Sequence, residues 1–255
     1  MESKTARYFL EVAYLGTQYG GFQKQNNTNT VQAEIERALQ VFFRDVIELT
    51  GSSRTDAGVH AYQNYFHFDY PLDLQEKLHR AVYHLNAILP DDIVVKRIAR
   101  VLDHGHCRFD ALSRTYEYRL YNNKNPFIKS QAYYFPYPLN MGLMETAAEI
   151  IRQNDDFQSF SKKHTQVHTY HCNILESRWE SEGDMLVYRV KGSRFLRGMV
   201  RGLVGTMLRV GTNKLDISDF RDIFQSHDCS KVDFSVPAHG LTLVKVSYKD
   251  DLFEV

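Results

Sequence analysis

The sequence predicts an α+β protein built from two split β-α-β halves, and three observations support this fold class. The chain has 255 residues, of which 43% are hydrophobic and 24% charged, so it has enough apolar content to bury a core and is not a disordered chain. Segments in which apolar residues alternate as in strands are interspersed with segments in which they have helical spacing. The order of elements in the first half returns in the second. We therefore expect two ferredoxin-like halves with mainly antiparallel sheets, packed into one pseudo-symmetric unit.

The first half, residues 1–111, is predicted to have the element order β-α-β-β-α-β. Apolar residues at helical spacing predict a helix over residues 30–43, and Asn29 followed by Gln32 three positions later is a helix start signal. Similar spacing predicts a second helix over residues 75–88, which Pro90 terminates. The predicted strands cover residues 8–14, 46–49, 63–69 and 93–95.

The second half, residues 112–255, repeats this element order but not the residues themselves. Two alternating segments, 174–180 and 185–190, predict a hairpin around Glu182-Gly183-Asp184. The boundary between the halves is predicted near residues 110–114, where no Gly/Ser-rich linker occurs. The remaining predicted elements are a strand at 115–121, helices at 143–152, about 195–210 and 217–224, and a strand at 241–248.

Several features indicate a cytoplasmic protein. No stretch approaches the ~18 apolar residues that a membrane-spanning helix needs, and Glu11 interrupts the first apolar residues, unlike a secretory signal. The three cysteines, Cys107, Cys172 and Cys229, form no C-x-x-C pair, which is typical of free thiols in a reducing compartment. Equal numbers of basic and acidic residues, 31 of each, give no overall sign of nucleic-acid binding.

Residues 51–60 form a small, polar, glycine-bounded segment between two predicted strands. Loops held by a rigid sheet are where reactive groups tend to lie. Within this 51–60 loop, Arg54 and Asp56 are two positions apart. A nearby arginine favours the ionised carboxylate, which is the form that a nucleophile or an electrostatic stabiliser requires. The alternative interpretation is that Asp56 only caps a turn before Gly58.

Positive charge concentrates between Met185 and Leu215, where no acidic residue occurs. On the helix predicted in this region, the arginines lie opposite an apolar arc, with Gly198 and Gly205 between them. Each helical glycine costs about 1 kcal/mol, so we expect another helix, a second subunit or a phosphate backbone to approach that face. The region is either a polyanion-binding site or a solvated face. Its basic residues are Arg189, Lys191, Arg194, Arg197, Arg201, Arg209 and Lys214.

Two further residue groups have alternative interpretations. Tyr116 and Tyr118 point to the same face of their predicted strand; Tyr116 can stack on a base or transfer a proton, or both tyrosines are core residues. Neither His104-x-His106-Cys107 nor His168-x-x-His171-Cys172 has the spacing of common zinc sites, so we expect no metal.

The segment Arg54-Thr-Asp-Ala-Gly-Val-His-Ala61 resembles the signature loop of the TruA family of tRNA pseudouridine synthases. Segments along nearly the whole chain resemble that family in the same order. Four residues depart from it. An acidic residue, tryptophan, glycine and asparagine are usual at the positions of Leu15, Phe22, Ser53 and Gly202, respectively. Matching segments include Tyr14-Leu-Gly-Thr17, Leu85-Asn86, Arg108-Phe109, Arg114-x-Tyr116-x-Tyr118, Asp156-Phe157 and Gly240-Leu241.

The resemblance implies a homodimer that isomerises uridine to pseudouridine at positions 38 to 40 of the tRNA anticodon stem-loop, without cofactor or metal. Asp56, kept ionised by Arg54, would attack the sugar or the base, or remove a sugar proton. Tyr116 would stack on the uracil and accept the C5 proton, while Arg201 would pair with Asp56 or a target phosphate. The other expected tRNA-binding residues are Lys191, Arg194, Phe195, Arg197 and Arg209.

Three alternatives remain at this point. A non-catalytic RNA-binding module resembling the RNA-recognition motif can share split β-α-β halves and a basic helix. A glycosidase needs two carboxyl groups in one site, and the 51–60 loop offers only Asp56, so this alternative ranks last. The third is the same isomerisation at a different target uridine.

Overall fold

The computed structural model describes residues 5–71, 75–163 and 167–254, and the chain divides into two compact units. Unit 1 comprises Met1–Leu112 and Leu243–Val255, and unit 2 comprises Ser113–Thr242. Residues 1–4, part of the N-terminus considered above, lie outside the described residues. Residues 243–255, which the sequence predicts in the second half, group with unit 1. In that unit the Tyr248 hydroxyl donates to Cys107 O at 2.6 Å, and the Leu102 N–H donates to Leu252 O at 3.1 Å.

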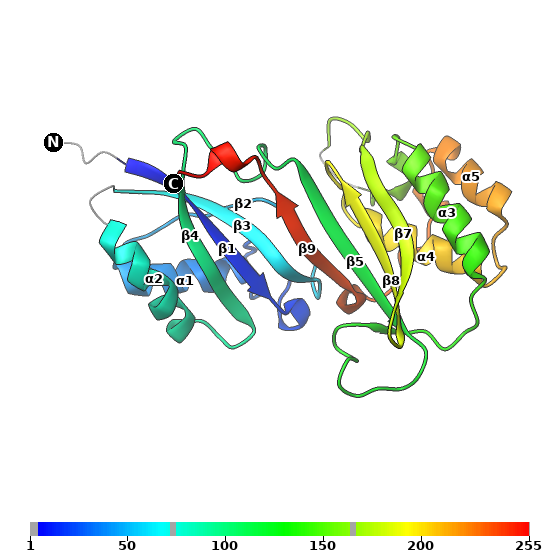
Figure 1. Ribbon diagram of the computed structural model, residues 1–255, viewed down its shortest axis with the longest axis horizontal. Coiled ribbons are helices and arrows are strands. Elements are labelled where there is room, and N and C mark those ends of the chain that lie inside the picture. Colours follow the sequence, from blue (N-terminus) through cyan, green and yellow to red (C-terminus); the bar gives the residue numbers. More distant parts are fainter. Residues whose placement is uncertain (1–4, 72–74, 164–166, 255) are drawn as a thin grey trace. The chain divides into compact units, whose positions relative to one another are not determined.

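Unit 1 is an antiparallel sheet with two helices that pack against each other on one side of it (Figure 1). The strand β1 lies between β3 and β4 and is antiparallel to both. The strand β9 (Leu241–Ser247) follows beside β3, where the backbone N–H of Val246 donates to Gln63 Oε1 at 3.1 Å. The other elements are β1 (Thr5–Tyr14), α1 (Val31–Phe43), β2 (Thr50–Gly51), β3 (His60–Pro71), α2 (Gln75–Ile88) and β4 (Ile93–Val101).

Two local predictions for unit 1 are wrong. The helix α1 is capped by Thr30, whose Oγ1 accepts from the Ala33 N–H at 3.3 Å, and not by Asn29. Residues 46–49 form no strand, although Leu49 is buried. Side chains of α1 bind their backbone instead: Gln32 Nε2 donates to Leu49 O at 2.8 Å, and Leu49 N–H donates to Glu36 Oε1 at 3.3 Å. The only strand here is the two-residue β2, Thr50–Gly51, which directly follows these residues.

Unit 2 is an antiparallel sheet with β8 between β5 and β7, and helices α3 and α4 on one of its faces (Figure 1). Trp179 of β7 points toward α4, and its Nε1 donates to the Met207 sulfur at 3.4 Å. No helix of the described ranges is both long and apolar enough to span a bilayer. The elements are β5 (Ser113–Tyr121), β6 (Tyr133–Tyr134), α3 (Met141–Gln153), β7 (Ile174–Glu182), β8 (Met185–Gly192), α4 (Met199–Gly211) and α5 (Ile217–Ser226).

The helix predicted from about residue 195 begins only at Met199, so this part of the prediction is wrong. Gly198 precedes it with a φ of +74°, a left-handed conformation that favours glycine. The backbone just before it bonds elsewhere: Ser193 N–H donates to Asn173 O at 2.9 Å, and Lys162 N–H donates to Arg197 O at 3.1 Å. Arg194, Phe195 and Arg197 therefore do not share a helix face with the arginines of α4.

Candidate active site

The 51–60 loop leaves the sheet of unit 1 after β2 and returns to it as β3. Its turn is closed by the Val59 N–H, which donates to the main-chain carbonyl of Asp56 at 3.2 Å. Gly58 adopts a φ of +79° within this turn, where a side chain would be strained. Asp56 is thus a turn residue, as the alternative interpretation expected, but the turn uses its carbonyl and not its carboxylate.

Asn64, a fully buried residue of β3, fixes the first part of the loop. Its Nδ2 donates to Ser53 O at 3.3 Å and to the Tyr14 hydroxyl at 3.1 Å. Its Oδ1 accepts from Ser52 Oγ at 2.7 Å. The Tyr14 hydroxyl also lies 2.8 Å from Thr55 Oγ1. One buried amide therefore connects Ser52, Ser53 and, through Tyr14, Thr55 to the sheet.

A second segment, residues 16–22, covers the loop from another side. Phe22 N–H donates to Thr55 O at 3.1 Å, and Gly16 N–H donates to His60 Nδ1 at 3.0 Å. A Cβ at Gly16 would lie 2.0 Å from Val59 O, so only glycine permits this approach. The backbone of the loop is thus held on both sides of Asp56 by groups distant in sequence.

Burial follows from these anchors. Thr55 and Val59 are buried, whereas Asp56 is half-buried and Arg54 is exposed. Among the ion pairs of the described residues, none joins Arg54 to Asp56, so the expected pairing is not formed in this structure. Ser53 has no left-handed backbone, since positive φ outside glycine occurs only at Arg44, Asn213 and His227 among the described residues. The departure from glycine at Ser53 therefore introduces no backbone strain.

Phe22, the other departure in this region, fills the space beside the loop. Its ring stacks on Phe66 with centroids 4.4 Å apart and an interplanar angle of 11°. A Cβ at Gly51 would lie 2.3 Å from this ring. A buried aromatic side chain thus fills the space beside the loop at the position where the family resemblance leads us to expect tryptophan.

In unit 2, Tyr116 meets Phe195 edge to face, with ring centroids 5.1 Å apart and an interplanar angle of 84°. Tyr116 is 8% exposed and lies on the face of β5 that carries the buried side chains. Lys191 of β8 is opposite Thr115, so it points to the other face of this sheet. The structure therefore brings Phe195 to Tyr116 and separates Lys191 from both.

The glycine face of α4 is covered by the chain itself. A Cβ at Gly205 would lie 2.2 Å from Asp233 O, and one at Gly202 would lie 2.8 Å from the Phe234 ring. Arg201 fastens the same segment, since its Nε donates to Val236 O at 2.9 Å. The group that packs closely on this helix face is thus the segment 231–236 of the same chain. It is not another helix, a second subunit or a phosphate backbone.

Arg209 acts on the same covering segment. Its Nη1 donates to Lys231 O at 3.5 Å, at the start of residues 231–236. Arg209 and Arg201 are both partly exposed. Each guanidinium group thus has a backbone partner in the chain and retains access to solvent.

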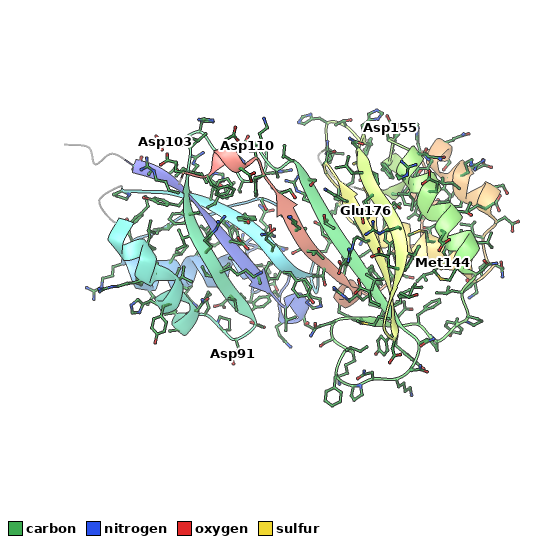
Figure 2. The ribbon with its side chains drawn as sticks, in the orientation of Figure 1. Asp91, Asp103, Asp110, Met144, Asp155 and Glu176 are labelled. Atoms are coloured by element: carbon green, nitrogen blue, oxygen red, sulfur yellow. The ribbon has the colours of Figure 1, made fainter. Side chains whose placement is uncertain are left out.

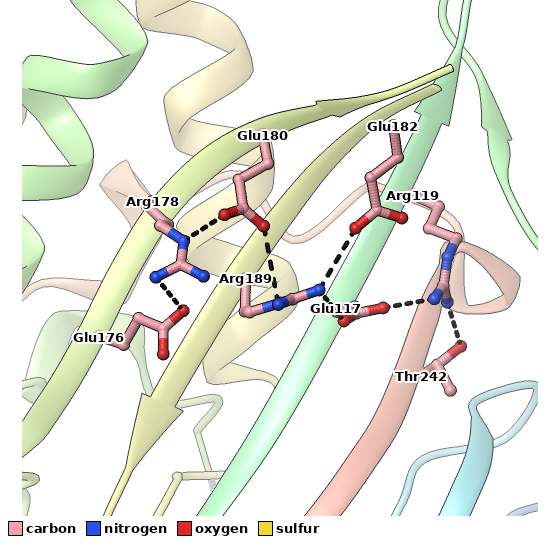
Figure 3. A network of polar contacts seen from close by, with 8 residues as sticks. All are labelled: Glu117, Arg119, Glu176, Arg178, Glu180, Glu182, Arg189 and Thr242. Atoms are coloured by element: carbon pink, nitrogen blue, oxygen red, sulfur yellow. Dashed lines mark hydrogen bonds and ion pairs between the residues drawn. The ribbon is translucent and has the colours of Figure 1, made fainter. Parts of the chain in front are cut away.

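The charge of Arg189 is neutralised within unit 2 (Figure 3). Its guanidinium lies 2.6 Å from Glu117 Oε1 and 3.3 Å from Glu182 Oε1, and Glu117 also pairs with Arg119. Glu117 is only 5% exposed at its side chain, so its burial depends on these two arginines. The network lies on the polar face of the sheet, together with Glu176 of β7 (Figures 2 and 3). Arg189 is therefore not an available tRNA contact.

Within the described ranges, one group of residues has metal-ligand chemistry. Ligand atoms of His67, His106 and Cys107 lie within 4.8 Å of one another. Their donors and acceptors are engaged within the protein: Cys107 Sγ donates to Thr50 O at 3.1 Å, and His106 Nδ1 accepts from the Arg108 N–H at 3.1 Å. Burial is the largest cause that lowers the pKa of His67 to about 4. The group fits a hydrogen-bonded packing element of unit 1 better than a cation site.

This group also fixes the connection after β4. Figure 2 labels Asp103 and Asp110 in that connection. Asp110 Oδ2 accepts from the His106 N–H at 2.6 Å, and His67 Nδ1 lies 3.2 Å from Cys107 Sγ. The sequence pointed to His104, His106 and Cys107; in the structure the group consists of His67, His106 and Cys107, and His104 is not part of it.

The sequence analysis missed the anchoring residues Asn64 and Tyr14. Both lie in strands whose alternation predicts burial, and a buried Asn between aromatic residues is an indication of a hydrogen-bonding role. No local pattern shows that their partners are Ser53 and Thr55.

Comparisons with known proteins agree with one another. A family model described as tRNA pseudouridine synthase matches residues 11–110 and 154–249. The tRNA pseudouridine synthase A of Porphyromonas gingivalis is 44% identical over 250 residues, which cover 97% of this chain and 99% of that protein. The protein of the same name from Parabacteroides distasonis is 42% identical, with 98% of each chain covered. That of Staphylococcus aureus (strain MRSA252) is 37% identical, with 96% and 92% covered.

Proposed function

The chain belongs to the tRNA pseudouridine synthase family, and we propose that it isomerises uridine to pseudouridine at positions 38 to 40 of the tRNA anticodon stem-loop. The family that the sequence resembled is thus the correct one. Two of the other interpretations, an RNA-binding module without activity and a glycosidase, lose their support, because the relatives are named as synthases that act on tRNA.

The reaction needs no net oxidation. The C1′–N1 bond breaks and a C1′–C5 bond forms between the same sugar and base; the C5 proton then leaves, and N1 takes up a proton. The enzyme must extrude the nucleotide and supply a group that stabilises or attacks the detached intermediate. Asp56 is the carboxylate that we assign to this step.

The observation that carries this assignment is the way in which the loop presents Asp56. Its neighbours Thr55 and Val59 are buried and bonded, while Asp56 itself is half-buried. Within the described parts of the chain, its carboxylate has no ion pair or side-chain hydrogen bond. A carboxylate on a fixed backbone, with its oxygen atoms unused by the fold, is suited to meet a substrate.

Unit 2 would supply the remaining groups. Tyr116, oriented by its edge-to-face contact with Phe195, would stack on the uracil and accept the C5 proton. Arg201 would approach Asp56 or a phosphate while it keeps its bond to Val236. Residues with basic side chains that would contact the tRNA backbone are Lys191, Arg194, Arg197 and Arg209.

The test uses tRNA labelled with tritium at uracil C5. We expect the wild-type protein to release the label and the Asp56→Ala variant to release none. Transcripts with single uridines replaced at positions 38, 39 and 40 identify the target. Release from a transcript that lacks all three uridines would contradict the proposed target, and no release from a folded wild-type protein would contradict the activity.

We also propose that the protein is a cytoplasmic homodimer. Its three cysteines are free thiols, which suits a reducing compartment where tRNA is present. The dimer rests on the family resemblance alone. Sedimentation velocity at micromolar concentration tests it, and a mass of about 30 kDa, near the 29.7 kDa of one chain, would refute it.

A further inference from the structure

Residues 122–132 of unit 2 form a loop whose two ends are tied together. Leu120 and Tyr121 at the end of β5 pair in parallel with Tyr133 and Tyr134 of β6. The Phe135 N–H then donates to Tyr121 O at 2.8 Å. Figure 1 shows this loop extending away from the helices and sheet of unit 2. Surface loops of this kind, closed at the base, are frequently functional.

The loop has a defined shape and an exposed aromatic side chain. The Phe127 N–H donates to Asn125 Oδ1 at 3.0 Å, and the Gln131 N–H donates to Ile128 O at 2.9 Å. Phe127 is 87% exposed, the highest value among the large hydrophobic residues described. A side chain of this size gains about 1.5–3 kcal/mol when it is buried, and Phe127 forgoes this gain within the chain.

A second exposed aromatic residue follows on the same segment. Tyr137 is 62% exposed, and the Lys214 Nζ lies 6.0 Å from the centre of its ring. The Asn140 N–H donates to Gly211 O at 2.8 Å, which fixes the segment against the end of α4. Single exposed hydrophobic residues are normal, but Phe127 and Tyr137 are two exposed rings on one stretch of sequence that also carries lysines.

The charge around these rings is positive. No Asp or Glu occurs from residue 118 to residue 144, in a chain that contains 31 acidic residues. Lys124 and Lys129 flank Phe127 and are exposed. Within the described ranges, neither these lysines nor Lys214 takes part in an ion pair. We call the exposed side chains of the 122–132 loop the aromatic–lysine surface: Lys124, Phe127 and Lys129.

An exposed aromatic ring next to lysines that form no ion pair can bind a nucleotide that is not base-paired. Bases stack on aromatic side chains, and lysines neutralise the adjacent phosphates. A protein partner is less well matched, because lysine is depleted at protein–protein interfaces. The isomerised base itself must enter a pocket that encloses it, which an open loop does not offer.

We propose that the aromatic–lysine surface binds an unpaired nucleotide of the tRNA substrate other than the one that is isomerised. This inference rests on the proposed function, because that function supplies the RNA. Phe127 stacks on the base, and Lys124 and Lys129 contact the neighbouring phosphates. The surface thereby contributes to the affinity and selectivity for tRNA and not to the chemical step.

The first experiment measures the binding of an unmodified tRNA transcript by fluorescence anisotropy. Phe127→Ala should raise the Kd about 5- to 150-fold, as expected for one lost base stack, with kcat at saturating tRNA unchanged. Phe127→Trp should bind like the wild type, whereas Phe127→Leu, which is apolar but cannot stack, should bind like the alanine variant. Tyr83→Ala is the matched control, since Tyr83 is 76% exposed in unit 1.

The second experiment measures the salt dependence. Lys124→Gln combined with Lys129→Gln should reduce the slope of log Kd against log salt by about 1.4 to 1.8, the loss of two phosphate contacts. An unchanged slope, wild-type affinity of Phe127→Ala, or full rescue by Phe127→Leu would overturn the inference. Dissociation of a wild-type dimer by Phe127→Ala, seen in sedimentation, would do the same, because a second copy would then occupy the surface.

These outcomes are separable from a failure of the proposed function. Release of tritium by the wild-type protein, together with wild-type tRNA affinity of Phe127→Ala, rejects only the aromatic–lysine surface. Failure of the wild-type protein to bind tRNA and to release tritium rejects both.

Discussion

The hydroxyl of Tyr14 lies 2.8 Å from Oγ1 of Thr55, the residue that directly precedes Asp56. Through this contact β1, a strand inside the sheet of unit 1, holds a loop residue that is 41 positions away in the sequence. The same hydroxyl accepts from Asn64 Nδ2 at 3.1 Å. The position of the proposed catalytic carboxylate is therefore set by buried polar groups that do not react.

Tyr14→Phe removes this hydroxyl and therefore its hydrogen bonds with Thr55 Oγ1 and Asn64 Nδ2. We expect the free energy of unfolding to fall by about 1–2 kcal/mol. We expect kcat to fall with KM nearly unchanged, because the loop loses precision and not tRNA contacts. Urea unfolding and tritium-release kinetics measure both effects. Tyr83→Phe, at an exposed tyrosine, is the control; equal kcat values for the two variants would show that the hydroxyl does not position the loop.

Asn64→Leu fills the same space with an apolar side chain and removes the hydrogen bonds of the amide to the Ser53 carbonyl, the Ser52 hydroxyl and the Tyr14 hydroxyl. A buried hydrogen bond contributes about 1 kcal/mol, so the loss of three predicts a lower melting temperature and a larger loss of stability than in Tyr14→Phe. Calorimetry provides the measurement. A melting temperature equal to that of the wild type would mean that water or another group replaces the amide.

Asp56→Asn keeps the size of the side chain but removes its charge. Because the fold does not use this carboxylate, stability should stay within about 0.5 kcal/mol of the wild type. Turnover should be abolished, while the Kd for tRNA stays within a few-fold. Near-normal turnover would exclude Asp56 as the reacting carboxylate, whereas loss of tRNA binding would make it a binding residue.

Gly205→Ala should destabilise the protein although alanine is the better helix former by about 1 kcal/mol. Its Cβ would lie 2.2 Å from Asp233 O, a backbone atom that cannot move without displacing residues 231–236. Gly142→Ala in α3 is the matched control, since its Cβ would lie 3.5 Å from the nearest side-chain atom. We expect Gly142→Ala to be neutral or stabilising. Thermal unfolding of both variants tests this prediction. Equal melting temperatures would refute the close contact between position 205 and Asp233 O.

Burial lowers the pKa of His67 to about 4, below its usual value of 6.5. The unfolded chain therefore binds more protons than the folded chain between these values. The contribution of His67 to stability is complete above pH 6.5 and is lost progressively as the pH falls toward 4. Unfolding free energies between pH 4 and 7 should show this decline, with a slope of at most about 1.4 kcal/mol per pH unit. A His67→Asn variant with an equally steep decline would assign it to other groups.

Much of the fold follows from local sequence patterns. The helices α1, α2 and α3 and most of the long strands begin and end within a few residues of the predicted positions, because their apolar periods extend over several turns or pleats. The strand β4 is the exception: the sequence predicts it over residues 93–95, and it extends over Ile93–Val101. Predictions that rested on short runs were less accurate. Residues 46–49 have strand-like composition, yet Gln32 and Glu36 take the hydrogen bonds that a partner strand would need.

The start of α4 shows the same limit. An apolar arc through Phe195 and Leu196 suggests a longer helix, but the backbone of residues 193 and 197 is bonded to Asn173 and Lys162. Helical periodicity describes which face of a segment is apolar. It does not reveal that distant backbone groups compete for the hydrogen bonds of the first turn.

The sequence by itself determined the family, the α+β class and Asp56 as the candidate reacting group, because signature residues and long apolar periods are local properties. Only the tertiary structure showed that Asn64 and Tyr14 hold the loop, that residues 231–236 cover Gly205, and that Arg189 is neutralised by Glu117. The physical reason is that buried hydrogen bonds and close backbone contacts join residues far apart in the chain. Their partners are chosen by strand register and packing, which no short stretch of sequence specifies.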